Sequence, residues 1–307
     1  MEIYHSFSDI PDGLTVSSLA VGTFDGIHLG HQKVLGKLCG TSAVITFTNH
    51  PYSVLHPESD LKALCSLDSR ISFLERHGID IIIAIPFTHE IANLSAEAFL
   101  AMVQKRVSFS TLVVGYDAHI GHGNSCSKEA LHLLGLKLGV SVVDVDALCY
   151  DGLPISSSRI RVAIQSGDLG VAEIMLGRRY SLRSTVVKGK GMGSHLGYKT
   201  ANFDIAGLCH PPCGVYAITA TIDGEKLHGI ANIGTAPTIK SLAQPILEVH
   251  FFEEVGALYG EDIEIAIKEF IREEKRFESV AQLQQQISCD IELSKDLGIR
   301  SRISELQ

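Results

Sequence analysis

The sequence has no excess of positive charge. Its 26 Lys and Arg residues stand against 35 Asp and Glu residues, which gives a formal net charge of −9. A chain of this sign does not favour a nucleic-acid partner. Any phosphate-bearing ligand must then be met locally, by helix N-termini, glycine-rich loops and a few placed cations.

Targeting signals, long apolar runs and a disulfide framework are also missing. The opening MEIYHSFSDI lacks the basic stretch and apolar core of a signal peptide. The apolar run at 79–87 is far shorter than the roughly 20 residues that cross a bilayer. Seven scattered cysteines do not indicate disulfides, and CHPPC at 209–213 lacks a second Cys/His pair for zinc. We expect a cytoplasmic protein with no membrane partner.

The first half of the chain alternates short apolar runs with helical patterns. Runs that are apolar on both faces are typical of strands in a parallel sheet, and they lie at 19–22, 43–47, 80–87, 111–115 and 141–146. Helical patterns at 69–78 and 95–106 lie between them, the second with Ser95 as N-cap. This alternation predicts a doubly wound α/β domain.

After about residue 180 the period changes to that of antiparallel strands. Residues 214–234 read as a hairpin around DGEK, and 245–253 and 262–271 alternate with period two. One helical pattern, 279–297, follows. The fold class is therefore α/β plus all-β: a parallel-sheet domain at 1–180, and a small antiparallel β-barrel with a terminal helix at 181–307.

The stretch VGTFDGIHLGH, residues 21–31, follows an apolar strand and opens a helix. Such a turn lies at the carboxyl edge of a parallel sheet, where these folds bind ligands, and the new helix N-terminus attracts phosphate. His28 and His31 are three residues apart and share one helix face. The alternative is that the glycines only turn the chain and the histidines only cap the helix.

The pattern G-x-F-D-G-x-H-x-G-H resembles the nucleotidyltransferase superfamily, and the whole chain resembles the bifunctional bacterial riboflavin kinase/FAD synthetases. The resemblance implies that His28 and His31 hold ATP and stabilise charge during transfer. It also implies an ATP-binding turn, made of Gly22, Thr23, Phe24, Asp25 and Gly26.

Two further segments of the first domain match this family. SSSRIR at 156–161 stands for the second ATP motif, with Ser156, Ser157 and Ser158 as phosphate ligands and Arg161 as a catalytic cation; the alternative is a plain helix N-cap.

GYDAHIGHGN at 115–124 stands for the flavin side. Asp117 matches the family there, and the alternative is a turn residue at a strand end. Ala118 and Ile120 replace two aromatics, and Asn124 stands where an arginine is usual. FTNHP at 47–51 keeps part of the family's F-x-P-H-P.

In the second domain GSHLGYKTAN at 193–202 matches the family's kinase motif, after a glycine-rich loop that contains Gly191. The resemblance implies that Thr200 and Asn202 bind Mg²⁺ and ATP phosphates through hard oxygen donors. A loop closed by an Asx turn is the alternative. Lys199 replaces the usual proline and Ser194 the usual arginine, so the loop loses a fixed φ and a phosphate contact.

Glu248, in LEVHFF at 247–252, stands where the family has its catalytic base. Leu247 and Val249 should point to the opposite face of the strand. The alternative is a solvated glutamate. Asn232 and Arg272 match positions that the family uses around the flavin, although Arg272 also reads as a surface cation.

These resemblances imply a cytoplasmic transferase that phosphorylates riboflavin to FMN and then adenylylates FMN to FAD. The small-molecule partners are riboflavin, FMN and ATP, with Mg²⁺ at both sites. Three alternatives stay open. The first is that only one module is active. The second is that the chain is a flavin- or nucleotide-binding regulator without catalysis. The third is that it is another nucleotidyltransferase, which leaves the barrel unexplained.

Overall fold

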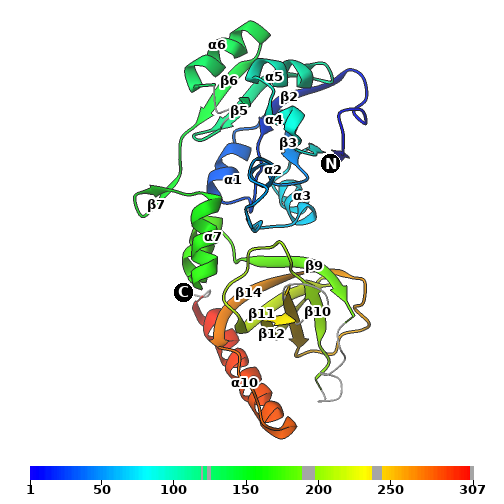
Figure 1. The fold of residues 1–307 in the computed structure, drawn as a ribbon, viewed down its shortest axis with the longest axis vertical. Helices are drawn as coiled ribbons and strands as arrows, with labels where there is room; N and C mark the ends of the chain where they lie inside the picture. Colours follow the sequence, from blue (N-terminus) through cyan, green and yellow to red (C-terminus); the bar gives the residue numbers. More distant parts are fainter. Residues whose placement is uncertain (119, 123–125, 189–197, 237–243, 305–307) are drawn as a thin grey trace. The chain divides into compact units, whose positions relative to one another are not determined.

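The computed structural model describes residues 1–118, 120–122, 126–188, 198–236 and 244–304. Its internal contacts divide the chain into two compact units, Met1–Arg159 and Ile160–Gln307. The first is built on a parallel sheet and the second on an antiparallel barrel (Figure 1). The predicted fold class is thereby confirmed.

In the described part of the first unit, six strands form a sheet in the order β1-β4-β3-β2-β5-β6, and every ladder is parallel. β3 and β4 are buried along their whole length, which explains why their sequences are apolar without alternation. The strands are β1 Glu2–Tyr4, β2 Leu14–Val21, β3 Ser42–Phe47, β4 Ile81–Ile85, β5 Val107–Gly115 and β6 Ser141–Val145.

Helices cover both faces of this sheet. α1 (Leu29–Leu35) and α3 (Leu67–Arg76) pack against the face that carries Val44. α5 (Ala96–Gln104) and α6 (Lys128–Leu138) pack against the face that carries its neighbour Ile45. Successive residues of β3 thus belong to opposite cores, as a pleated strand requires. Short elements complete the unit: α2 (Pro51–Leu55), α4 (His89–Ala92) and the hairpin β7 (Cys149–Tyr150) and β8 (Leu153–Pro154).

Two helices, α7 (Ser157–Ser166) and α8 (Leu169–Leu176), precede the barrel. The barrel strands run in the order β10-β13-β12-β11-β14-β9, and pairing of β9 with β10 closes it. Every ladder is antiparallel. The bounds are β9 Ser181–Val187, β10 Ala201–Asp204, β11 Gly214–Ile222, β12 Glu225–Ala236, β13 Gln244–Phe251 and β14 Asp262–Arg272.

The remaining features of the second unit follow local sequence signals. Asp223 and Gly224, with φ of 52° and 81°, form the tight turn between β11 and β12 that the DG pair predicts. The long helix α10 (Val280–Ser304) contacts β11, β12 and β14.

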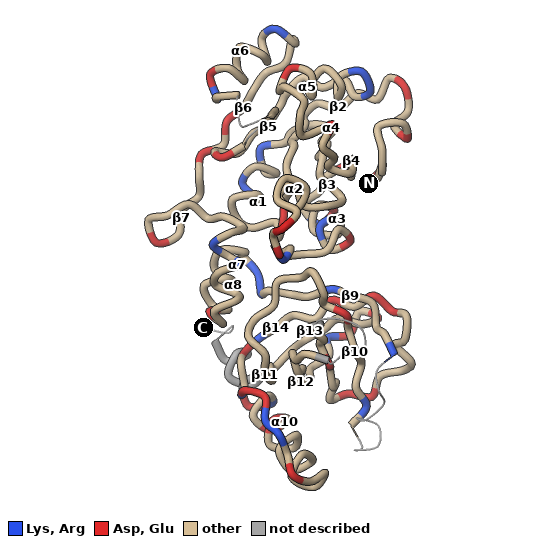
Figure 2. The backbone as a smooth tube through the Cα atoms, in the orientation of Figure 1, with Lys and Arg blue, Asp and Glu red and all other residues tan. Residues whose placement is uncertain are grey.

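Charged residues of both signs are interspersed along the two units (Figure 2). Of the helices in the described ranges, none is at once long and apolar enough to cross a membrane.

Candidate active sites

Three sequence-predicted segments of the first unit meet at one edge of its sheet. Residues 22–28 follow β2, residues 48–51 follow β3, and Asp117 follows β5. These strands are parallel, and β2 is the neighbour of both others. Their carboxyl ends therefore bring the three segments to the same edge, the usual ligand position in such folds.

The turn after β2 has an unusual backbone. Phe24 and Ile27 have positive φ angles of 50° and 39°, and Gly26 has a φ of 79°. A Cβ on Gly26 would lie 2.8 Å from Leu64 Cδ1, so glycine is required there for space as well as for conformation. A positive φ strains the backbone of a non-glycine residue. Such residues cluster at ligand sites, where the surrounding structure holds them in this conformation.

Asp25 holds this turn together. Its side chain is 1% exposed, and its carboxylate accepts hydrogen bonds from the backbone N–H of Leu64 (2.9 Å) and of Cys65 (3.3 Å). The Cys65 thiol in turn accepts from Gly26 N–H at 3.2 Å. Burial, with the Asp25 charge beside it, raises the pKa of Cys65 to about 11. The carboxylate predicted to face ATP is thus engaged in building the turn.

His28 and His31 lie together at the start of α1. His28 is the N-cap residue, and its Nδ1 accepts from His31 N–H at 3.3 Å. The neutral His28 ring therefore carries its proton on Nε2. The two rings stack with centroids 3.6 Å apart and planes 17° apart, and the Phe24 ring edge lies 5.2 Å from His31.

His31 is held in its neutral form. Burial of the ring, followed by the charges of His28 and Arg70, holds the pKa of His31 well below its usual value. Its Nδ1 is buried and has no hydrogen-bond partner in the described ranges. The stacked pair thus presents neutral N–H donors rather than two adjacent cations.

Gly30 supplies the space for this stack. A Cβ at Gly30 would lie 3.0 Å from His28 Cε1 and 3.1 Å from His28 Nδ1. With no side chain, Gly30 leaves room at the start of α1, and the His28 ring lies in that room.

The SSSRIR segment forms the start of α7. Ser156 Oγ accepts from Arg159 N–H at 3.3 Å, and Ser157 Oγ donates to the Asp25 carbonyl at 2.9 Å. Ser158 is exposed. Arg161 is 9% exposed and lies four residues after Ser157, on the same face of α7. Both the capping role and a link to the VGTFDGIHLGH turn are thus present.

Sequence reasoning missed a buried cation in this unit, Arg70 on α3. It is 4% exposed, and its Nη1 donates to Thr46 Oγ1 (3.2 Å) and to the Phe47 carbonyl (2.7 Å). Thr46 Oγ1 donates onward to the Thr23 carbonyl at 3.0 Å. Arg70 therefore ties the end of β3 to the turn after β2. From the helical pattern of the sequence alone, Arg70 reads as a residue on the solvent-facing side of the helix.

On the predicted flavin side, Asp117 is exposed in the turn after β5. Burial, together with the neighbouring Asp117 carboxylate, raises the pKa of Tyr116. Ala118 packs against the core that contains Ile120. Asn124 lies outside the described residues.

Three residues of the second unit that were predicted for the kinase site form a row across three strands. Asn202 of β10 pairs with Glu248 of β13, and Glu248 pairs with Asn232 of β12 on its other side. Directly paired residues point to the same face of a sheet. Glu248 is exposed, whereas Leu247 and Val249 are buried inside the barrel, so the row lies on the outer face. The predicted orientation of Glu248 is confirmed.

Thr200 is exposed one residue before β10. The carbonyl of the preceding residue, Lys199, accepts a hydrogen bond from His250 Nδ1 at 2.9 Å. Gly191 and Ser194 lie outside the described residues.

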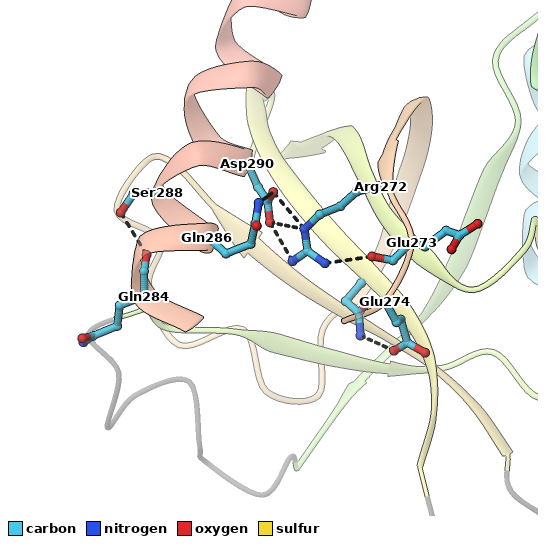
Figure 3. Close-up of polar contacts among 8 residues, drawn as sticks. Arg272, Glu273, Glu274, Gln284, Gln286, Ser288 and Asp290 are labelled. Carbon is cyan, nitrogen blue, oxygen red and sulfur yellow. Dashed lines mark hydrogen bonds and ion pairs between the residues drawn. The ribbon is translucent and has the colours of Figure 1, made fainter. Parts of the chain in front are cut away.

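Arg272, predicted beside the flavin, forms an ion pair with α10 (Figure 3). Its Nε lies 3.0 Å from both carboxylate oxygens of Asp290, and its Nη2 lies 2.8 Å from Oδ2. Asn232 Nδ2 donates to Glu274 Oε1 at 3.1 Å, two residues along from Arg272. The row and the ion pair are thus adjacent, and Arg272 has a clear structural role.

Comparison with known proteins adds two family models that cover most of the chain. The FAD synthetase model matches residues 11–159, and the riboflavin kinase model matches residues 176–297.

Whole-chain relatives agree with these models. The bifunctional riboflavin kinase/FMN adenylyltransferase of Bacillus subtilis (strain 168) is 34% identical over 94% of this chain and 95% of its own. The protein of the same name from Escherichia coli (strain K12) is 32% identical over 93% of each chain. A crystal structure of a protein named macrolide-efflux protein, from Streptococcus pneumoniae, has a TM-score of 0.80 and 28% identity, and covers 95% of this chain and 98% of that one.

Proposed function

Since the chain belongs to the family of bifunctional riboflavin kinase/FMN adenylyltransferases, we propose that both of its modules are active and that FAD forms in two ATP-dependent steps. The observation that carries this proposal is that, within each unit, residues predicted for its site lie side by side. The first has the stacked histidines at α1, and the second has the row Asn202–Glu248–Asn232. We place the module boundary near residue 180, just before β9.

In the kinase step Glu248 is the general base. An exposed carboxylate on the outer barrel face accepts the proton of the riboflavin 5′-hydroxyl as its oxygen attacks the γ-phosphorus of ATP and ADP leaves. Asn202, directly beside Glu248, and Thr200 contact the phosphates. Asn232, on the other side of Glu248, contacts the flavin. Arg272 acts there by holding α10 in place.

The oxygen donors beside Glu248 fit Mg²⁺. Thr200 and Asn202 offer a hydroxyl and an amide oxygen, the hard ligands that this ion accepts. In the described ranges, no three His, Cys, Asp or Glu side chains cluster as a metal site. The side-chain oxygens of Thr200 and Asn202, together with nucleotide phosphate oxygens, would form a suitable coordination shell for Mg²⁺. The ion would neutralise phosphate charge there.

In the adenylyl transfer the nucleophile is the FMN phosphate, which attacks the α-phosphorus of ATP and releases pyrophosphate. His28 Nε2–H, with the neutral His31 beside it, donates to the phosphate oxygens as their charge grows. Ser156, Ser158 and Arg161 provide further donors at the start of α7, whereas the Ser157 hydroxyl is already bonded to the Asp25 carbonyl. Asp117 contacts the flavin from the turn after β5.

The turn residues Gly22–Gly26 act by shape. Because its carboxylate is bound to the amides of residues 64 and 65, Asp25 does not fit as a direct metal ligand. We assign it, with Thr23 and Phe24, to fixing the turn around the ATP phosphates. Mg²⁺ at this site would then be carried by the nucleotide.

We propose a cytoplasmic location, with riboflavin, FMN and ATP as the partners and no nucleic acid among them. Two features support it: all seven cysteines are free thiols, as in a reducing compartment, and both reactions consume ATP.

Separate assays of FMN and FAD formation test the proposal. With ATP and Mg²⁺, the wild-type chain should convert riboflavin to FMN and then FAD, as followed by chromatography. His28→Ala should lose FAD but keep FMN formation, and Glu248→Ala should lose FMN formation but still adenylylate supplied FMN. One inactive module in the wild type would favour the single-activity alternative, and tight flavin binding without either product would favour a regulator.

A further inference from the structure

The kinase row is completed by a contact that does not belong to any strand ladder. The β10–β13 pairing ends at Ala201 opposite Val249. Beyond that pair the next hydrogen bond between the two segments comes from a side chain, His250 Nδ1 to the Lys199 carbonyl at 2.9 Å. A carbonyl can only accept, so Nδ1 carries the proton.

His250 is itself held in place. It follows Glu248 by two residues on β13 and therefore lies on the same outer face. Its ring meets the Tyr198 ring edge-on, with centroids 5.2 Å apart and planes 87° apart, and the Phe252 ring lies 6.4 Å away. These contacts fix the direction in which Nδ1–H points.

The segment before Thr200 is anchored on both sides. Tyr198 Oη lies 3.0 Å from Ser288 Oγ of α10, and the next residue, Lys199, is bound to His250 of β13. Thr200 follows at once and is exposed. The anchor thus fixes the backbone from which Thr200 and Asn202 extend toward the position of the phosphates.

We propose that His250 is a positioning residue of the kinase module, which holds the Lys199–Thr200 peptide so that Thr200 and Asn202 face Glu248. This inference rests on the proposed kinase function. Lys199 makes the anchor more important in this chain, because a proline at that position would fix φ near −65° and lysine does not. With φ of Lys199 left free, the hydrogen bond from His250 orders this peptide.

Three substitutions separate the hydrogen bond from the ring. In His250→Asn the amide nitrogen occupies the place of Nδ1 and keeps a donor there. In His250→Gln the amide lies one carbon further out, and in His250→Phe the aromatic contacts remain without any donor. We expect His250→Asn to keep the KM for MgATP within about threefold of wild type. His250→Gln and His250→Phe should raise that KM about tenfold, the size expected from one hydrogen bond.

The adenylylation of supplied FMN by the same chains is the internal control and should not change. Hydrogen exchange measured by mass spectrometry over residues 198–204 gives a readout independent of activity. It should become faster in His250→Phe and stay near wild type in His250→Asn. Adding Lys199→Pro to His250→Phe should restore part of the lost affinity for MgATP.

The outcomes are distinct. If His250→Phe leaves both exchange and KM unchanged, or if His250→Asn is as impaired as His250→Phe, the positioning role is wrong. If the wild-type chain makes no FMN while exchange responds as described, the proposed function fails but the anchor stands.

Discussion

Removing one partner of the ion pair between Arg272 and Asp290 should strongly destabilise the second unit. Asp290 is 1% exposed, and besides the Arg272 guanidinium it accepts a bond from Gln286 Nε2 at 2.9 Å. Replacing Asp290 with Asn leaves the Arg272 charge, whose side chain is only 14% exposed, without its counter-ion. Breaking a buried pair in this way costs about 3–5 kcal/mol.

We expect a value near the lower end, about 3 kcal/mol, because Arg272 keeps some contact with water. In a domain of this size each kcal/mol shifts the melting temperature by about 2–4 °C, so Asp290→Asn should melt roughly 10 °C lower. Calorimetry of the full-length wild type, Asp290→Asn and Arg272→Met under the same conditions measures these differences in melting temperature. The double variant should lose less than the two single losses added together, because it leaves neither charge unpaired.

The same variants test the flavin prediction for Arg272. If Arg272 acts only through α10, both single variants should raise the KM for riboflavin equally. If it binds the flavin, Arg272→Met should raise that KM clearly more. Single variants that both melt within about 2 °C of wild type would refute the stability reasoning itself.

Three further predictions concern the first unit. Gly30→Ala should reduce FAD formation at least tenfold, with FMN formation unchanged, because its Cβ would lie 3.0 Å from the His28 ring; equal loss of both products would contradict this. The pKa of His31 is lower in the folded chain than in the unfolded chain, so the unfolded chain takes up the proton first as the pH falls. The free energy of unfolding of the wild type should therefore decrease below about pH 6.5, by up to about 1.4 kcal/mol per pH unit. Chemical denaturation should show a less steep decrease for His31→Gln. The Cys65 thiol, with its pKa near 11, should resist iodoacetamide at pH 8 in the native chain while exposed Cys39 reacts, and mass spectrometry of the labelled peptides should show this order.

The fold class could be predicted because the hydrophobic periodicity of a segment and the residues that cap helices or form turns are local properties of the sequence. Ser95 caps α5 as expected, with its Oγ accepting from Ala98 N–H at 3.1 Å, and the DG turn joins β11 to β12. The helix that VGTFDGIHLGH was expected to open, α1, also begins within that segment, at Leu29. Each of these features depends on residues within a few positions of one another.

The parts that were missed depend on distant partners. Residues 201–204 form the barrel strand β10, although no strand was predicted there, because four residues show strand character only when β13 pairs with them. Arg70 contacts residues more than 20 positions away, and Asp290 lies on a helix that the sequence predicted without any link to Arg272. Such contacts leave no periodic signal.

The row Asn202–Glu248–Asn232 also makes the proposed kinase face sensitive to alignment errors in β13. Because side chains alternate along a strand, a slip of one residue would turn Glu248 into the apolar interior and bring Leu247 and Val249 out to water. Misaligned barrels would therefore lose core packing and the proposed proton acceptor in a single event. A single-residue insertion or deletion in this strand should yield a chain that fails to fold rather than a stable chain without kinase activity.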